Sequence, residues 1–331
     1  MPVPLTTATK SADHGRKTSR RRFTFESRLF HGVTFVSAMF VLAVMAAVLL
    51  TLGTQAWPVF ARFGLSFFSS SEWDTVNDQY GALAPILGTL LTSLIALLIA
   101  VPLSLGIAVF VTELSPEWLK GPVGTAIELL AAVPSVIFGM WGLFVFAPLF
   151  GKHVHPWISK TFGTVPVLRN IVSGPPIGIG TFTAGFILAL MILPFITATI
   201  RDVFEIVPVT LRESAYVMGS TTWEVVSKVI LPYTKAGVVS GIILGLGRAL
   251  GETMAVTFVI GNSHHLTWSL FMPATTISAT IANDFAEASA GLHQSALIAL
   301  GFLLFVITSI VLTISKLVLY RLAQLQEGEN R

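Results

Sequence analysis

The sequence predicts an all-α integral membrane protein with six membrane-spanning helices and both termini in the cytoplasm (N-in/C-in). Hydrophobic residues make up 53% of the 331 residues and charged residues only 11%, whereas soluble domains carry about 25% charged residues. The mean hydropathy is +0.79. Six apolar segments are each long enough to cross a bilayer core of about 30 Å, which takes roughly 20 helical residues.

The six apolar segments follow one another from near the N-terminus almost to the C-terminus. The second and third exceed the length of a span and contain Pro102 and Pro134, so we expect kinks or tilt there. The first is about twice as long as a signal-peptide core and is expected to stay uncleaved. A membrane domain at 30–323 is therefore predicted, between a basic, disordered N-terminus at 1–29 and a cytoplasmic tail at 324–331. The segments lie near 30–53, 83–112, 122–149, 179–203, 235–262 and 293–320.

The distribution of Lys and Arg predicts the orientation of the chain. With the N-terminus in the cytoplasm, fifteen of the 20 basic residues fall in cytoplasmic segments and four in external loops, as the positive-inside rule requires. A basic tail can also bind nucleic acid, but beside a hydrophobic helix it is more often an orientation signal. Seven basic residues lie before the first span: Lys10, Arg16, Lys17, Arg20, Arg21, Arg22 and Arg28.

Several classes of site are disfavoured by the composition. The chain has no cysteine, which excludes disulfides, thiolate catalysis and Cys-based metal sites. His153, His155, His264 and His265 fall in predicted external loops without metal-ligand spacing, so we expect them to be solvated. No cluster of His, Asp and Glu or activated nucleophile lies near a membrane face, so neither a catalytic residue nor a metal site is predicted.

The polar segment between the fourth and fifth spans is predicted to be two short helices at 207–231. Pro208 suits the first turn of a helix, and Gly219 lies where a left-handed cap would end it. Thr221 and Glu224 have the spacing of a capping box that begins a second helix, which Pro232 is expected to end. Periodicity alone does not separate a plain connector from a helix pair that docks on a cytoplasmic partner.

This segment resembles the EAA coupling loop of ABC importer permeases. The family pattern is Glu-Ala-Ala, three residues, Gly, nine residues and Ile-x-Leu-Pro, with Ser and Val replacing one Ala and the Ile here. The resemblance implies a bundle of the type I ABC importer class whose helix pair contacts the ATP-binding subunit. The residues implied in ATPase coupling are Glu213, Ser214, Ala215, Gly219, Leu231 and Pro232.

From about residue 30 to the end, the chain resembles phosphate ABC transporter permeases of the PstC type. The stretches that carry the resemblance lie at 72–93, 128–150, 201–226 and 245–262. It implies a non-enzymatic pore subunit of the bacterial inner membrane that imports phosphate. The implied partners are a second, PstA-type permease, two ATP-binding subunits, an extracytoplasmic phosphate-binding protein and membrane lipid, but no nucleic acid. The chain has no phosphate-binding loop of the ATPase type, so no cofactor is expected on it, and ATP and Mg²⁺ would bind the partner ATPase.

Arg248 and Glu252 lie inside the fifth apolar segment, four residues apart. An Arg near the bilayer midplane costs at least about 2.5 kcal/mol, so its side chain is expected to face the bundle interior or a wet pathway. Guanidinium can hold two oxygens of an anion. Glu252, expected one turn later on the same helix face, could pair with Arg248 or accept a hydrogen bond from protonated phosphate. The resemblance favours a substrate pathway, with a structural ion pair as the alternative.

Other residues of the spans have plainer interpretations. Ser135, next to Pro134, could lend donors to an anion where the third helix is broken. Gly241–Gly245 and Gly247–Gly251 both have the small-xxx-small spacing of close helix contacts. Two other functions stay open: a permease for another oxyanion, sulfate or molybdate, and a membrane scaffold that chiefly signals phosphate status.

Overall fold

The computed structural model describes the backbone of residues 11–163, 165–288 and 291–329, and side chains from 29 to 321 apart from 164, 166–168 and 289–290. The chain divides into two units, Met1–Thr54 and Gln55–Arg331. The described part of the first unit belongs to helix α1, Ser11–Phe63. Its side chains from Leu29 onward are apolar and mostly exposed. A helix that is apolar on every side is stable in lipid.

The helical backbone over residues 11–29 differs from the disorder that was predicted there. The basic residues of this stretch have high helix propensity, and they continue a helix that the apolar segment has already nucleated. The expected tail at 324–331 likewise continues a helix, because α15 runs over Leu292–Glu329. The remaining residues of both predicted tails, 1–10 and 330–331, lie outside the described part of the chain.

Six helices in the described residues are long and apolar enough to span a membrane. The second, fourth and sixth begin and end within a few residues of the prediction. The first begins as expected but continues ten residues further, to Phe63. The third and fifth differ in register. The six run over Leu29–Phe63, Leu83–Leu114, Ser135–Phe162, Thr181–Glu205, Thr222–Leu250 and Leu292–Arg321.

The third span is not the predicted segment 122–149. Helix α4, Glu117–Ala131, ends before Pro134, which has the extended angles φ −58° and ψ 138°. Proline lacks an N–H and disfavours helical angles at the residue before it, so the helix breaks here. The span begins again with α5, Ser135–Trp141, and reaches Phe162 through short α-helical and π-helical segments. These are η2 (Gly142–Phe146), α6 (Ala147–Leu149), η3 (Phe150–Val154) and α7 (His155–Phe162).

The fifth span is also shifted from its predicted position at 235–262. It consists of α11 (Thr222–Val225), the π-helical turn η4 (Val226–Ile230) and α12 (Leu231–Leu250). Pro232 therefore does not end a helix, because it lies in the first turn of α12 and the wider π-turn precedes it. The chain turns at residues 251–253 and re-enters a separate short helix, α13, Met254–Ile260.

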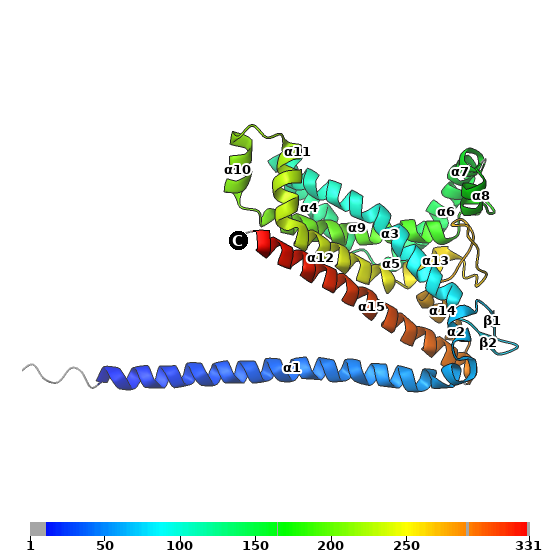
Figure 1. Cartoon of the computed structure of the whole chain (residues 1–331), viewed down its shortest axis with the longest axis horizontal. Coiled ribbons are helices and arrows are strands. Elements are labelled where there is room, and N and C mark those ends of the chain that lie inside the picture. Colours follow the sequence, from blue (N-terminus) through cyan, green and yellow to red (C-terminus); the bar gives the residue numbers. More distant parts are fainter. Residues whose placement is uncertain (1–10, 164, 289–290, 330–331) are drawn as a thin grey trace, which may run out of the picture. The chain divides into compact units, whose positions relative to one another are not determined.

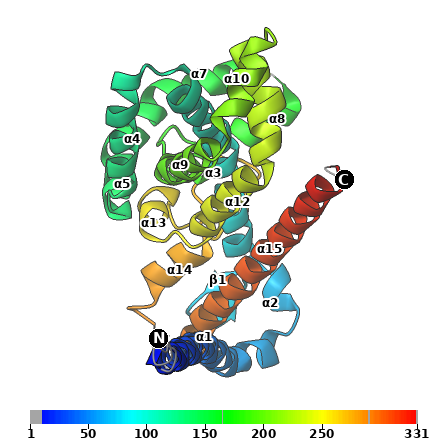
Figure 2. The same cartoon turned by 90° about the vertical axis from the view of Figure 1, so that its left-hand side faces the viewer.

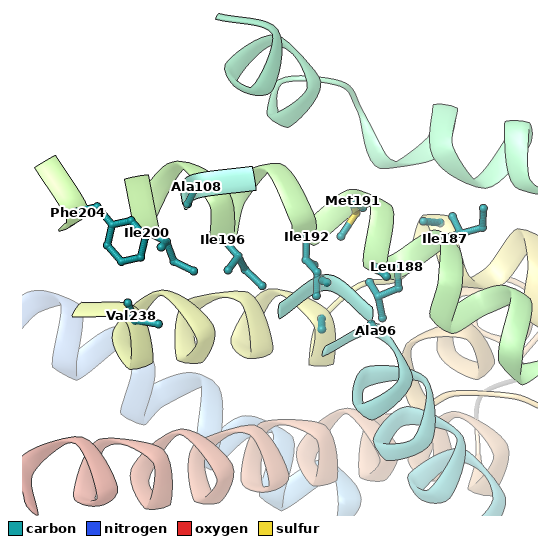
Figure 3. Packing of buried hydrophobic residues seen from close by; sticks show 14 of the residues in the cluster. Ala96, Ala108, Ile187, Leu188, Met191, Ile192, Ile196, Ile200, Phe204 and Val238 are labelled. Carbon is teal, nitrogen blue, oxygen red and sulfur yellow. The ribbon is translucent and has the colours of Figure 1, made fainter. Parts of the chain in front are cut away.

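Helix α9, Thr181–Glu205, is the most buried of the spans and lies at the centre of the Gln55–Arg331 unit. It packs against α3 (Leu83–Val109), α4, α12 and α13. Ile192, Ile196, Ile200 and Phe204 form a buried row along it, facing α12 and α3 (Figure 3). These residues recur every four positions, which is the spacing of one helix face.

Close packing on α9 depends on glycines of α12. A Cβ placed at Gly245 would lie 2.5 Å from Ile196, and one at Gly241 would lie 3.1 Å from Thr199. The prediction that the Gly241–Gly245 spacing serves close helix contact is therefore confirmed. The same prediction is wrong for Gly247–Gly251, because a Cβ at Gly247 would make only an ordinary contact with Leu312 and one at Gly251 would reach no other helix. Helix α15 runs beside α12 on another side (Figure 2).

The two ends of the Gln55–Arg331 unit carry different structures (Figure 1). At one end lie α10, Val209–Val217, and α11. At the opposite end a two-stranded antiparallel hairpin, β1 (Trp73–Asp74) and β2 (Gln79–Tyr80), pairs Trp73 with Tyr80. We call these the coupling end and the hairpin end.

A second buried cluster lies under the hairpin end. It joins Tyr80, Ile277, Leu297 and Leu300, which come from β2, α14 (Ile277–Asp284) and the first half of α15. Two short helices complete the connections of the unit, α2 (Ser66–Ser69) before the hairpin and α8 (Pro166–Val172) after α7. A five-residue π-helical segment, η1, extends α3 over Phe110–Leu114.

Candidate functional site

Arg248 lies in the last turn of α12, at the point where the fifth span breaks. Its side chain is exposed on the surface of this chain, and its guanidinium carbon lies 5.7 Å from the centre of the Phe195 ring. A guanidinium over an aromatic face gains a modest cation–π attraction. Among the described residues no carboxylate forms an ion pair with Arg248, so its charge is available to another group.

Glu252 does not lie on the same helix face as Arg248. The predicted continuous helix is wrong at this point, because α12 ends at Leu250 and Gly251 begins a turn. Oε1 of Glu252 instead accepts a hydrogen bond from the backbone N–H of Ala255, at 3.3 Å. The carboxylate thus caps the start of α13, where unpaired N–H groups favour a negative charge.

The predicted pairing of Arg248 with Glu252 is absent from the described ion pairs. Gly251 closes α12 with φ −93° and ψ −1°, and the chain turns before α13 begins at Met254. The prediction placed the two charges one turn apart because it treated residues 235–262 as an unbroken helix. Because the helix breaks after Leu250, Arg248 has no carboxylate partner among the described residues, and Glu252 caps α13 instead.

Helices α5 and α13 run side by side in the same direction. A Cβ placed at Gly139 of α5 would lie 3.0 Å from Cα of Ala255. One turn later, a Cβ at Gly142 would lie 3.0 Å from the side chain of Val259. Matching pairs at increasing residue numbers on both helices define a parallel arrangement.

This register places Ser135 level with the break between α12 and α13. Ser135 is the first residue of α5 and is half-buried. Its hydroxyl makes no hydrogen bond within the described residues. The prediction that Ser135 lies at a helix break is confirmed, while its role toward an anion stays a prediction. Two helix breaks, in the third and fifth spans, therefore lie at one level of the bundle.

The coupling end has the two-helix form that the sequence predicts. Gly219 has a left-handed φ of +86° between α10 and α11. Thr221 caps α11 by accepting from the N–H of Glu224, and the Glu224 side chain accepts from the N–H of Thr221 at 3.0 Å. The capping box is therefore confirmed.

The residues implied in ATPase coupling take different positions at this end. Glu213, Ser214 and Pro232 are exposed, Leu231 is half-buried, and Ala215 is buried against the core. Large apolar side chains of the same two helices are bare, with exposed fractions of 87% for Val217, 80% for Met218 and 73% for Trp223. Large exposed apolar patches occur at surfaces that bind another protein or a membrane.

A buried ion pair fastens α10 to the bundle, and the sequence did not predict it. Nη1 of Arg212 lies 2.9 Å from Oε1 of Glu113, whose side chain is only 5% exposed. Nη2 of Arg212 also donates to the carbonyl oxygen of Phe204. The available signal was a single carboxylate at the end of the second apolar segment, which does not identify its partner. A second link joins Arg201 to Glu128 at 3.1 Å.

The histidines of the hairpin end are more ordered than expected. His155 is 2% exposed and packs edge-on against Phe271, so its predicted solvation is wrong. His264 stacks on Trp73 with ring centres 5.1 Å apart. Burial lowers the pKa of His264 to about 4, so its ring is neutral at pH 7. No group of three or more potential metal ligands occurs within the described residues.

Comparison with known proteins identifies the family. Residues 100–324 match the family described as "Binding-protein-dependent transport system inner membrane component". The chain is 59% identical over 302 residues to the phosphate transport system permease protein PstC of Pasteurella multocida, covering 91% of this chain and 94% of the relative. It is 51% identical over 326 residues to the PstC protein of Xylella fastidiosa strain Temecula1, covering 98% of each.

Solved structures share the fold at low sequence identity. A bacterial alginate ABC transporter, solved in complex with an alginate pentasaccharide-bound periplasmic protein, aligns with a TM-score of 0.56 and 18% identity. The alignment covers 90% of this chain and 94% of the other. The six apolar helices and this family make the protein a multi-pass protein of the inner membrane. The chain belongs to the binding-protein-dependent inner membrane transport components and, among them, to the PstC phosphate transport system permeases.

Proposed function

We propose that this chain is one of two permease subunits of an ATP-driven importer that carries inorganic phosphate into the cytoplasm, past Arg248. The observation that carries the proposal is the exposed guanidinium of Arg248 at the end of a span, without a carboxylate partner in the described residues. A cation in this position is costly in lipid and useful on an anion pathway. Phosphate is the substrate class named for relatives that are 51–59% identical.

The assembly that this function requires places a partner on each exposed part of the chain. A PstA-type permease would cover the face that carries Arg248. Two ATP-binding subunits, which hold ATP and Mg²⁺, would contact the bare apolar side chains of α10 and α11. No cofactor would bind this chain. The coupling end would face the cytoplasm and the hairpin end the outside, in agreement with the distribution of Lys and Arg.

The transport cycle follows from this arrangement. A phosphate-loaded binding protein docks outside, and ATP binding closes the ATPase pair on α10 and α11. The movement passes through the buried Glu113–Arg212 pair and along the fifth span, and it opens the pore outward. Phosphate then enters near Arg248, whose fork of N–H donors binds two of its oxygens. ATP hydrolysis returns the pore to its inward-facing state.

Glu252 is proposed to help select phosphate over fully deprotonated oxyanions. Phosphate at neutral pH keeps a hydroxyl that can donate a hydrogen bond to a carboxylate, whereas sulfate has none and is repelled. One oxygen of Glu252 caps α13, which leaves the other for substrate. Glu252→Gln keeps the capping oxygen and removes the charge, so it separates selectivity from helix stability.

The test is radiolabelled phosphate uptake by cells that lack this chain and receive either wild type or Arg248→Gln. We expect at least a tenfold loss of uptake at equal membrane level and equal co-purification of the ATPase, because one tenfold step is about 1.4 kcal/mol of lost stabilisation. Glu252→Gln should lower the preference for phosphate over sulfate. Normal phosphate uptake by Arg248→Gln would remove Arg248 from the pathway. Failure of wild type to restore phosphate uptake would direct the assay to sulfate and molybdate.

A further inference from the structure

Two adjoining pockets open at the hairpin end. The first has a volume of about 670 Å³ and lies between the hairpin, α14 and the start of α15. The second, of about 700 Å³, lies on the other side of Trp73 and shares Trp73, Asn262 and His264 with it. Neither pocket includes Arg248 or any residue of the helix breaks.

The wall between the pockets is a fixed aromatic unit. The rings of Trp73 and Tyr80 meet edge to face at 5.1 Å, and His264 stacks on the indole. Nε1 of Trp73 donates a hydrogen bond to Oδ2 of Asp284 at 3.0 Å. Tyr80 is 2% exposed, which holds the unit against the second buried cluster. The pockets therefore have a preformed shape.

The lining of both pockets is acidic. Asp78, Asp284 and Glu287 line the first pocket, and Glu72 and Asp74 line the second. Within the described residues no lysine or arginine lines either pocket. Burial lowers the pKa of His264 to about 4, so its ring is uncharged, and burial raises the pKa of Asp284 against the opposing effects of the Trp73 hydrogen bond and of His293 in the same pocket.

The acidic and aromatic lining of the two pockets favours binding of a cationic group and disfavours binding of an anion. Carboxylates and the electron-rich face of an aromatic ring together bind ammonium and guanidinium groups. Free phosphate is repelled by the same charges. The described residues contain no group of three or more ligands that could hold a metal ion. Five carboxylates spread over two pockets also exceed what a single small cation would pair with.

We infer that the two pockets receive lysine or arginine side chains from the extracytoplasmic phosphate-binding protein when it docks on this subunit. The inference rests on the proposed function, because it needs an external hairpin end and a binding-protein partner. Charge complementarity across such a contact raises the association rate and fixes the orientation of docking. The acidic pockets would also keep free phosphate away from the mouth, so that phosphate enters only from the docked protein.

The experiment uses the full transporter in proteoliposomes with purified, phosphate-loaded binding protein. The initial rate of phosphate uptake is measured against the concentration of binding protein at low and high salt. The test variant is Asp284→Asn/Glu287→Gln, in which Asn keeps an oxygen for the Trp73 hydrogen bond. The control is Glu117→Gln, which removes an almost fully exposed carboxylate at the opposite end.

We expect the half-saturating concentration of binding protein to rise roughly tenfold in the test variant, while the maximal rate stays unchanged, since charge pairs act mainly on encounter and docking. The salt dependence should weaken, because screening then has fewer charges to act on. The control should match wild type in both quantities. Adding more binding protein should therefore rescue the test variant completely.

An unchanged half-saturating concentration of binding protein would overturn the inference. If the maximal rate of uptake also fell, the carboxylates would act in translocation rather than in docking. Direct binding of the binding protein to nanodisc-embedded transporter gives a second readout that does not depend on uptake. If wild type transports no phosphate, the proposed function fails, and this binding measurement still decides the docking inference. Magnesium or spermidine binding in the pocket, with binding-protein affinity unchanged in the variant, would assign it to a small cation instead.

Discussion

The coupling end and the hairpin end of the Gln55–Arg331 unit are built from contacts of different range. At the coupling end, the turn between α10 and α11 depends on Gly219 and on the reciprocal hydrogen bonds of Thr221 and Glu224, three residues apart. At the hairpin end, Trp73 bonds Asp284, 211 residues away. A pair of short helices can therefore form from contacts between residues close in sequence. A pocket of fixed shape depends on contacts between residues that are far apart in sequence.

The hairpin end should be the more sensitive of the two to a single methyl group. Gly88 of α3 lies against the loop before α14, and a Cβ there would meet the carbonyl oxygen of Thr275 at an impossible distance of 1.8 Å. Gly88→Ala must move backbone, so we expect a loss of about 3 kcal/mol or more, at or above the upper end for overpacking. Thermal unfolding of the purified transporter measures it.

Gly106→Ala is the matched control for this prediction. It changes the same helix by the same methyl group, but no atom lies within 4 Å of the new Cβ in this chain. It should be neutral or raise stability by roughly 0.5–1 kcal/mol, the usual gain from replacing a mid-helix glycine. Equal unfolding temperatures for the two variants would contradict the contrast between the ends.

The coupling end also has long-range contacts, and the Glu113–Arg212 pair is more buried than the Arg201–Glu128 pair. Glu113→Gln leaves the largely buried guanidinium of Arg212 without its carboxylate, which typically costs about 3–5 kcal/mol for a buried pair. We place it second because the carbonyl oxygen of Phe204 still accepts from Arg212. ATP hydrolysis and phosphate uptake, measured together in proteoliposomes, should show hydrolysis with reduced uptake.

The double variant Glu113→Gln/Arg212→Met separates two effects of losing the ion pair. One is the cost of an unpaired buried guanidinium, and the other is the loss of the connection between α10 and η1. It removes the unpaired cation, so stability should recover in part, while coupling between hydrolysis and uptake stays low. Full recovery of coupling in the double variant would show that the pair only stabilises the fold.

The smallest loss of stability is expected at the capping box of α11, which depends only on residues close in sequence. Thr221→Ala removes the side-chain oxygen that accepts from the N–H of Glu224, and loss of such a cap costs about 1 kcal/mol. The hairpin end should not respond, because it lies at the opposite end of the unit (Figure 1). Hydrogen exchange of the 207–231 segment would detect the change, and Thr221→Ser, which keeps the oxygen, should behave as wild type. Faster exchange at the hairpin would argue against independent ends.

The range of contacts also explains what could be predicted from the sequence. The number of spans followed from segment length and composition, and the capping box from Thr221 and Glu224 alone. The pairing of Arg212 with Glu113 could not be predicted, because two charges distant in sequence carry no sign of their partner. The ordered state of His155 and His264 was missed for the same reason.

The candidate site was predicted in its residues but not in its geometry. Arg248 was recognised because an arginine within an apolar segment is costly. The break after Leu250 was missed, because Gly251 within an apolar run also fits a helix-packing position. Pro134 was recognised as a kink, yet the sequence did not indicate that the span would start again after it rather than before it.

The continuity of the fifth span has a mechanical consequence. From Thr222 in α11 to Leu250, close to Arg248, the chain is one continuous helix of 29 residues, about 43 Å long at 1.5 Å per residue. No break in the helix lies between these two residues, so under the proposed function a tilt of the ATPase-contacting end would displace Arg248 at the other end. The π-turn at Val226–Ile230 determines the direction around the helix axis in which the residues after it project. One residue more or fewer there would turn Arg248 about 100° around the helix axis, away from its proposed position on the phosphate pathway.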